Sequence, residues 1–251
     1  MANIIRCKLP DGVHRFKPFT VADYRDFLLV RNDMVSKDEK EQEVLVNELA
    51  ADYFGEYPES WQHYIFLQAF TGSIGKTKIP IVFECPVCGK KTKRLFNLSQ
   101  GPLDNPKVQL NDDTYISFKF PENLEDEPSQ LILKNVDKIE YQGSTYNWME
   151  LSKETQDAII SMINFEKFEA IVKMLKPLHF EMKLKCCEEH TLVYDDLCSI
   201  FKLLINPDEV FPFYEINHIL IKNNYDINSI MAMLPAERSI ALSLIEKDNK
   251  K

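Results

Sequence analysis

Glycine is scarce in this sequence, and long hydrophobic runs are absent. Only 7 of the 251 residues are glycine, so glycine-rich phosphate-binding loops have little to be built from. No stretch approaches the roughly 20 consecutive apolar residues of a membrane-spanning helix. The first residues, MANIIRCKLPDG, also lack the basic and then apolar order of a secretory signal. We therefore expect a cytosolic chain with no membrane partner.

Basic residues are fewer than acidic residues in this sequence. The chain has 39 Asp and Glu against 30 Lys and Arg, a formal net charge of −9 at pH 7. A negative field opposes non-specific binding to nucleic acid and to anionic lipid. A nucleic-acid site would therefore need a local basic patch. The candidate is KKTKR at residues 90–94, although lysine-rich strands more often serve as solvated edges.

Catalytic motifs are also missing. There is no G-x-S-x-G nucleophile motif, and the five histidines are scattered along the chain. The stretch GSIGKT at residues 72–77 ends like a phosphate-binding loop, but Phe70 stands where the motif requires its first glycine. We predict that the chain is not an enzyme and has no catalytic or cofactor-binding residues.

The hydrophobic pattern predicts an α+β fold, with helical N- and C-terminal regions around antiparallel hairpins. Three regions are expected: a strand and helices over 1–75, an antiparallel β region with two cysteine hairpins and an inserted helix over 76–200, and helices over 201–251. Thr20 with Asp23, and then Ser36 with Glu39, are predicted to begin the first two long helices. Ser152 is predicted to begin one long helix that continues to about Leu175.

Six cysteines do not suggest a disulfide framework in a chain of this length. Two segments about a hundred residues apart share a layout of alternating strand, cysteine-bearing turn and return strand. They are IPIVFECPVCGKKTKRLFNL and HFEMKLKCCEEHTLVYDDL. Such a layout is what a split zinc ribbon needs, with two turns that meet at one metal ion.

Zinc prefers four tetrahedral ligands, mainly thiolate and imidazole, and a C-x-x-C turn places two sulfur atoms together. We predict a structural zinc held by Cys85, Cys88, Cys187 and His190, with Cys186 as an alternative ligand. Cys186 is in phase with the inward residues of its strand, which keeps that alternative open. The competing interpretations are reduced cysteines that pack as small hydrophobic residues, and a redox role.

Several segments together resemble baseplate hub proteins of T-even-like bacteriophages. They are Phe19-Thr20-Val21 at the first helix, WQHYIFLQAFTGSIGK running into IPIVFECPVCGKK, and the C-terminal NPDEVFPFYEINHILIKNNY. In the family, an aromatic-rich helix, a short S-x-G turn and a cysteine-bearing strand occur in this order. Among its members, the chain most resembles those that assist hub assembly.

The resemblance implies a tail-assembly protein in the cytoplasm of the infected host cell. It would promote association of hub subunits without a chemical reaction, would have other phage hub proteins as partners, and could be absent from the mature virion. Two alternatives are a stoichiometric structural subunit of the hub and a zinc-ribbon protein that binds nucleic acid. The oligomeric state is left open.

Overall fold

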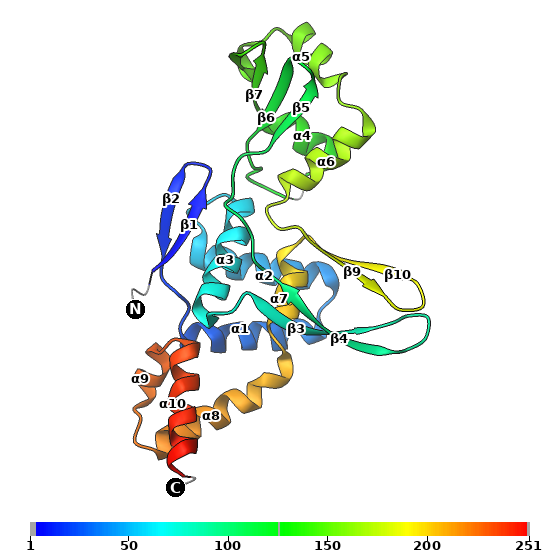
Figure 1. Ribbon diagram of the computed structural model, residues 1–251. Helices are drawn as coiled ribbons and strands as arrows, with labels where there is room; N and C mark the ends of the chain where they lie inside the picture. The colour runs from blue at the N-terminus through cyan, green and yellow to red at the C-terminus, as the bar shows by residue number, and fades with distance from the viewer. Residues whose placement is uncertain (1–3, 125, 250–251) are drawn as a thin grey trace.

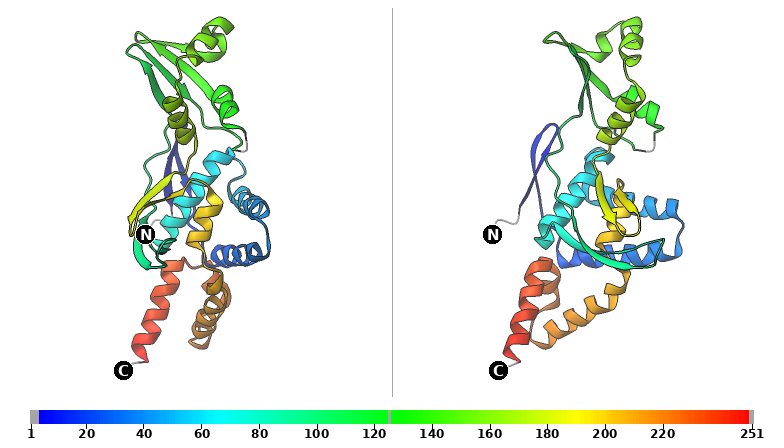
Figure 2. Two further views of the ribbon diagram at one scale, coloured as in Figure 1. Left: turned by 90° about the vertical axis from the view of Figure 1, so that its right-hand side faces the viewer. Right: turned by 45° about the vertical axis from the view of Figure 1, so that its right-hand side comes forward.

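The computed structural model describes residues 4–124 and 126–249 and shows an α+β protein with small antiparallel sheets. The molecule is elongated (Figures 1 and 2). A helical body lies in the middle, a β-rich unit at one end and the C-terminal helices at the other. Two long hairpins project sideways from the body. The α+β class predicted from the sequence is confirmed.

The helices of the described chain are α1 (Val21–Asp33), α2 (Glu39–Phe54), α3 (Glu59–Ile74), α4 (Pro128–Asn135), α5 (Lys153–Ile160), α6 (Phe165–Leu175), α7 (Leu197–Leu204), α8 (Val210–Lys222), α9 (Ile227–Ala232) and α10 (Pro235–Asp248). The strands are β1 (Ile5–Leu9), β2 (Gly12–Phe16), β3 (Lys78–Glu84), β4 (Lys91–Asn97), β5 (Lys107–Asn111), β6 (Thr114–Phe118), β7 (Val136–Tyr141), β8 (Ser144–Asn147), β9 (Phe180–Lys185) and β10 (Glu189–Tyr194). Short 3-10 turns occupy Met34–Ser36, Trp148–Glu150 and Pro207–Glu209.

Helices α1, α2, α3 and α7 build the main core around fully buried aromatic rings. The rings of Phe27 and Phe66 lie 5.3 Å apart, and Phe201 from α7 packs against both. Helix α1 begins as predicted, because the Thr20 side chain accepts from the Asp23 amide while the Asp23 carboxylate accepts from the Thr20 amide. The aromatic spacing of the sequence therefore serves packing between helices.

One prediction about the N-terminal region was wrong in detail, and one strand was not predicted. Helix α2 begins after Asp38, whose capping box is completed by Glu41, and not after Ser36. Ser36 belongs to the 3-10 turn that ends the preceding segment. Strand β2 was not predicted from the sequence; it pairs with β1 across the turn at Pro10 and Asp11 and is only five residues long.

The unit at the far end of the molecule has its own hydrophobic core. Its four-stranded sheet has the order β5-β6-β7-β8, and α5 and α6 bury Ile159, Ile171 and Leu175 in a cluster with the sheet. The single long helix predicted after Ser152 is two helices, because the chain breaks after Ile160 and Asn164 caps α6 anew. The unit is inserted between β4 and β9.

The C-terminal helices pack against α1 and α3. The Val21 amide donates to the Met233 carbonyl at 2.8 Å, and the Tyr24 hydroxyl donates to Glu209 at 2.6 Å. Asp226 caps α9, and Pro235 occupies the first turn of α10. Among the described residues, no helix has the length and apolarity to cross a bilayer.

Candidate metal centre

The first cysteine turn joins β3 to β4 and is held by backbone hydrogen bonds. The Gly89 amide donates to the Cys85 carbonyl at 2.8 Å, and the Cys85 amide donates to the Lys90 carbonyl at 3.0 Å. Gly89 has a φ of +68°, which an L-residue with a side chain adopts only at a cost. The turn thereby places the side chains of Cys85 and Cys88 on the same side of the loop.

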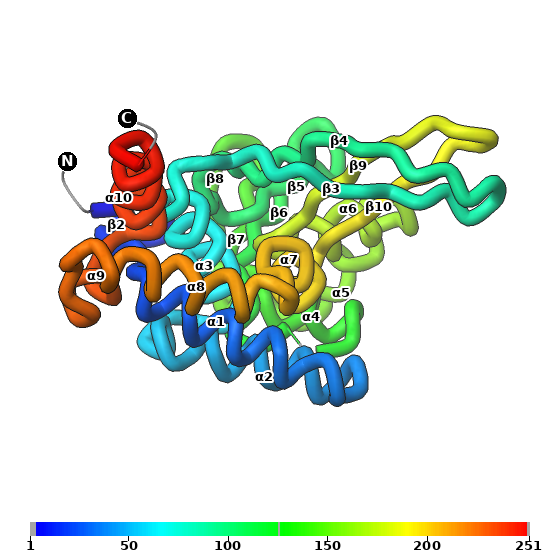
Figure 3. The backbone as a smooth tube through the Cα atoms, turned by 90° about the horizontal axis from the view of Figure 1, so that it is seen from below, coloured from blue at the N-terminus to red at the C-terminus, as the bar shows by residue number. Residues whose placement is uncertain are grey.

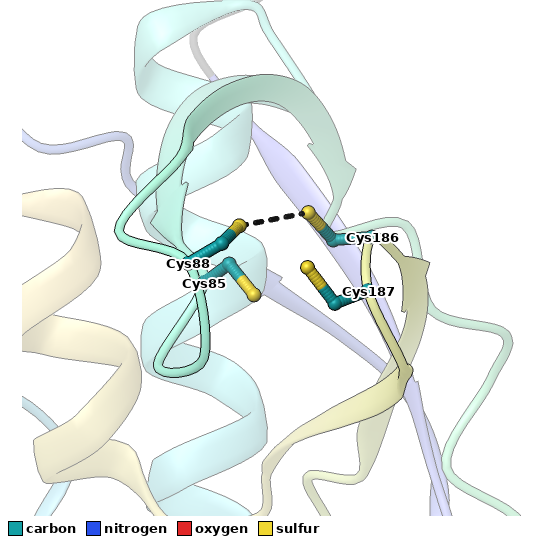
Figure 4. A group of neighbouring side chains, drawn as sticks. All are labelled: Cys85, Cys88, Cys186 and Cys187. Carbon is teal, nitrogen blue, oxygen red and sulfur yellow. Dashed lines mark hydrogen bonds between the residues drawn. The ribbon is translucent and has the colours of Figure 1, made fainter.

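The second cysteine turn joins β9 to β10 and is tighter. The last paired residues of the ladder are Lys185 and Glu189, so only three residues form the connection. The Cys186 amide donates to the Glu188 carbonyl at 3.0 Å. Adjacent residues of a strand point to opposite faces, but at this turn both Cys186 and Cys187 point toward the first hairpin (Figure 4).

The two hairpins meet through their inner faces. Phe83 and Leu184 are buried in a small cluster together with Cys85. Closer to the body, the ring of Phe96 lies 5.7 Å from that of Phe180 on β9. Aromatic pairs at such distances stabilise beyond their buried area, so the sheets are held face to face along their length.

Four sulfur atoms converge where the hairpin tips meet. The Sγ atoms of Cys85, Cys88, Cys186 and Cys187 all lie within 4.8 Å of one another. The Sγ atoms of Cys88 and Cys186, 98 residues apart in the chain, are separated by 3.5 Å. Sulfur atoms that surround zinc at about 2.3 Å in a tetrahedron are about 3.8 Å apart. The donor set therefore fits a tetrahedral thiolate site.

His190 lies beside this group. Its Nε2 atom is 3.6 Å from the Sγ of Cys85, and its ring is 5.3 Å from that of Phe83. It belongs to the inner face of β10, opposite Leu184. All five predicted or alternative ligands are thus brought to one place. Cys186, treated from the sequence as a substitute, lies together with Cys187, because the short turn lets both sulfur atoms face the first hairpin.

The thiols of this group differ in pKa because their surroundings differ. Hydrogen bonding from the backbone amides of Cys88 and Val87 lowers the pKa of Cys85 to about 6. A hydrogen bond with Cys88, followed by desolvation and the charge of Cys88, raises the pKa of Cys187 to about 12. The pKa of Cys186 is raised for similar reasons. A divalent cation would reverse these upward shifts, because it stabilises every thiolate that it binds.

The two remaining cysteines belong to the main core. Burial alone raises the pKa of Cys7 to about 11, and burial is the largest cause that raises the pKa of Cys198. Neither thiol is close to the hairpin tips, and both pack among apolar neighbours. They behave as small hydrophobic residues, which is one of the alternatives considered for all six from the sequence.

The phosphate-loop look-alike at residues 72–77 has the wrong structural context. Helix α3 ends at Ile74, Gly75 takes the left-handed conformation that ends a helix, and β3 follows from Lys78. A phosphate-binding loop needs a strand before it and a helix after it, the reverse of this order. The stretch is a helix C-cap.

Comparison with known families identifies two matches that together span almost the whole chain. The family described as T4 bacteriophage base plate protein matches residues 1–202. The family described as baseplate hub assembly protein Gp51 C-terminal domain matches residues 204–250. The boundary falls at the end of α7, so the second match comprises α8, α9 and α10. No curated protein and no solved structure matches the chain.

These matches confirm the resemblance drawn from the sequence. The first match covers far more than half of the chain and includes both cysteine hairpins and the inserted unit. Membership implies interaction with other baseplate proteins of the phage. The chain therefore belongs to the T4 bacteriophage base plate protein family and functions in the assembly of the baseplate hub.

Proposed function

We propose that the chain is a chaperone-like, non-enzymatic factor that promotes association of hub subunits in the cytoplasm of the infected host cell. The observation that carries this proposal is the match of α8, α9 and α10 to the hub assembly domain, in continuity with a base plate match over the rest. An assembly factor of this kind needs a stable body with surfaces for its clients. The packed helical core and the projecting hairpins supply both.

A structural zinc ion is part of this proposal. Cys85, Cys88, Cys186 and Cys187 would hold it as a closed four-thiolate site, which leaves no open position for catalysis. The set predicted from the sequence, with His190 in place of Cys186, is the alternative. The ion would join the two hairpins into a split zinc ribbon and add binding free energy on the order of 10 kcal/mol to folding.

Replacing Cys88 with serine tests the zinc site. We expect the Cys88→Ser variant to lose most of its zinc by elemental analysis, and its melting temperature to fall with it, because three ligands remain. The matched control is Cys198→Ala, which perturbs the main core and is expected to lower stability without changing zinc content. Wild-type protein without zinc, together with an unchanged melting temperature in Cys88→Ser, would refute the site.

A second pair of variants identifies the ligands. With four thiolate ligands, Cys186→Ser reduces zinc affinity strongly, whereas His190→Asn has a small effect. The opposite order would establish His190 as the ligand and Cys186 as its neighbour, as first predicted.

Complementation tests the assembly role. In cells infected with phage that lacks this chain, supplying it in trans is expected to restore hub formation, measured by sedimentation of the hub complex. Hubs that form equally well without the chain would contradict the proposal. Pull-downs from cells that lack one hub protein at a time would then identify the direct partner.

The base plate match over residues 1–202 also favours a second function, that of a stoichiometric structural subunit of the hub. Mass spectrometry of purified virions separates the two. An assembly factor is expected to be absent or present in trace amounts, whereas a subunit is present in a fixed ratio to the other hub proteins.

A further inference from the structure

The outer face of the β3–β4 hairpin, turned away from β9–β10, has an exposed apolar centre. In the ladder Val82 lies opposite Lys93, and Pro80 lies opposite Leu95. Their neighbours Ile81 and Phe96 are buried in the main core cluster, so these four residues point outward. Val82 is 61% exposed and Leu95 is 65% exposed. Two large apolar side chains thus lie at diagonal positions of the two strands on a sheet face open to solvent.

Positive charge surrounds this apolar centre. Residues 78–97 contain five basic residues and one acidic residue, although the whole chain carries a net charge of −9. Lys91 is paired across the strands with Glu84 at 3.4 Å. Lys78 and Lys93 have no carboxylate within 4.0 Å among residues 4–124 and 126–249. The positive charges of Lys78 and Lys93 on this face are therefore not neutralised by ion pairs within the described residues.

We propose that this outer hairpin face, made of Lys78, Pro80, Val82, Lys93 and Leu95, docks an acidic segment of another protein in the assembling hub. The inference rests on the proposed function and specifies the chemistry of the partner. Apolar residues of the segment would cover the Val82–Leu95 centre, and its carboxylates would pair with the two lysines. An apolar centre with a charged rim is the usual anatomy of a protein interface.

An acidic protein segment explains the face better than the alternatives do. Single-stranded nucleic acid binds by stacking on aromatic side chains, of which this face has none. A duplex binds through a positive field, which the net charge of −9 opposes. Lysines on an exposed strand also oppose aggregation, but that role gives no reason for Val82 and Leu95 to be exposed among them.

The position of the β3–β4 hairpin makes it accessible to another protein. Seen from below, its outer half extends beyond the helices, alongside β9–β10 (Figure 3). The cysteine group lies at its tip, so zinc would hold the face rigid before a partner arrives. A pre-ordered face loses less conformational entropy on binding than a mobile hairpin would.

Peptide binding to the full-length, zinc-loaded chain tests the proposal. The probes are fluorescent 12-residue peptides of alternating Glu and Leu, the same peptide with Lys for Glu, and a 20-base-pair DNA duplex, followed by anisotropy. We expect saturable binding of the Glu-Leu peptide alone. Lys78→Glu/Lys93→Glu should weaken it at least tenfold, and Val82→Ser/Leu95→Ser should also weaken it.

The charge-matched control is Lys222→Glu/Lys247→Glu, at the ends of α8 and α10, which should bind as the wild type does. Equal loss in this control, unchanged binding in the hairpin variant, or tighter binding of DNA would overturn the proposal. So would self-association that is abolished by the hairpin variant in sedimentation, because the occupant would then be a second copy.

The complementation assay separates this inference from the proposed function. If the wild-type chain does not restore hub formation, the assembly role fails, whatever the peptide binds. If the wild-type chain and the Lys78→Glu/Lys93→Glu variant restore it equally well, the assembly role stands and the docking face is wrong. Loss of hub formation in the hairpin variant alone, with the control active, supports both.

Discussion

His63 is a buried titratable residue in the main helical body. Its side chain is 5% exposed in α3, and Nε2 lies 3.1 Å from the Oδ1 of Asn47. Burial lowers the pKa of His63 from 6.5 to about 4, and the charge of Asp196 offsets this only in part. The unfolded chain therefore binds a proton more readily than the folded one between these values.

Stability should consequently fall as the pH drops from above 6.5 toward 4. Between pH 7 and pH 5 the loss from His63 is expected to be about 2 kcal/mol. Urea unfolding at both pH values measures it, and His63→Gln, which keeps a donor toward Asn47, should remove most of the difference. An equal loss in the variant would assign the pH dependence to other groups.

Among the elements, the β7–β8 hairpin offers a clean test of turn chemistry. Gln142 and Gly143 both have positive φ, 49° and 79°, as a two-residue type I′ turn requires. Asparagine adopts this conformation more readily than glutamine does. Gln142→Asn should therefore stabilise the inserted unit by about 0.5 kcal/mol, read from the urea midpoint of Trp148 fluorescence.

Gly143→Val is the converse change. The φ of +79° at this position is strained for a β-branched residue, so this variant should lower the free energy of unfolding of the unit by on the order of 1–2 kcal/mol, seen as a lower urea midpoint. If both variants leave the midpoint unchanged, the turn does not limit the stability of the unit.

The sequence predicted those elements whose boundaries are set by local chemistry. Thr20 and Ser152 cap helices as expected, because the capping side chain and its amide partner lie within three residues. Helix α2 was misplaced because Ser36 and Asp38 both fit the capping pattern. The split at Asn164 was missed because the apolar spacing continues across the break.

The candidate site was predictable in part for a similar reason. The C-x-x-C turn of Cys85 and Cys88 is a local pattern, and its hairpin follows from strand alternation on both sides. The ligands on the second hairpin depend on how a three-residue turn orients Cys186 and Cys187, which no spacing rule determines. Which of them binds a metal, with or without His190, stays a prediction, as do the domain boundaries.

At the scale of the whole molecule, two hydrophobic cores predict two unfolding events. Trp61 packs against the main core, and Trp148 is buried in the core of the inserted unit. These are the two tryptophans of the chain, so Trp148→Phe and Trp61→Phe each leave one reporter. A chelator should lower the urea midpoint seen by Trp61 by about 1 M or more, because the hairpins pack on the main core.

The midpoint seen by Trp148 should stay within error, since the inserted core contains no residue of the two hairpins. A single transition that both reporters share, with or without chelator, would show that the two cores unfold as one unit.

Because Cys88 and Cys186 are 98 residues apart in the chain, the ribosome adds them at different times. A ribosome that adds about 5–20 residues per second needs about 5–20 s to pass from one cysteine to the other. Throughout that interval the nascent first hairpin has two of the four clustered cysteines and no facing sheet for Phe83. A chain truncated before the second turn can never bring the four sulfur atoms together, so their convergence distinguishes copies that extend past Cys187 from those terminated earlier.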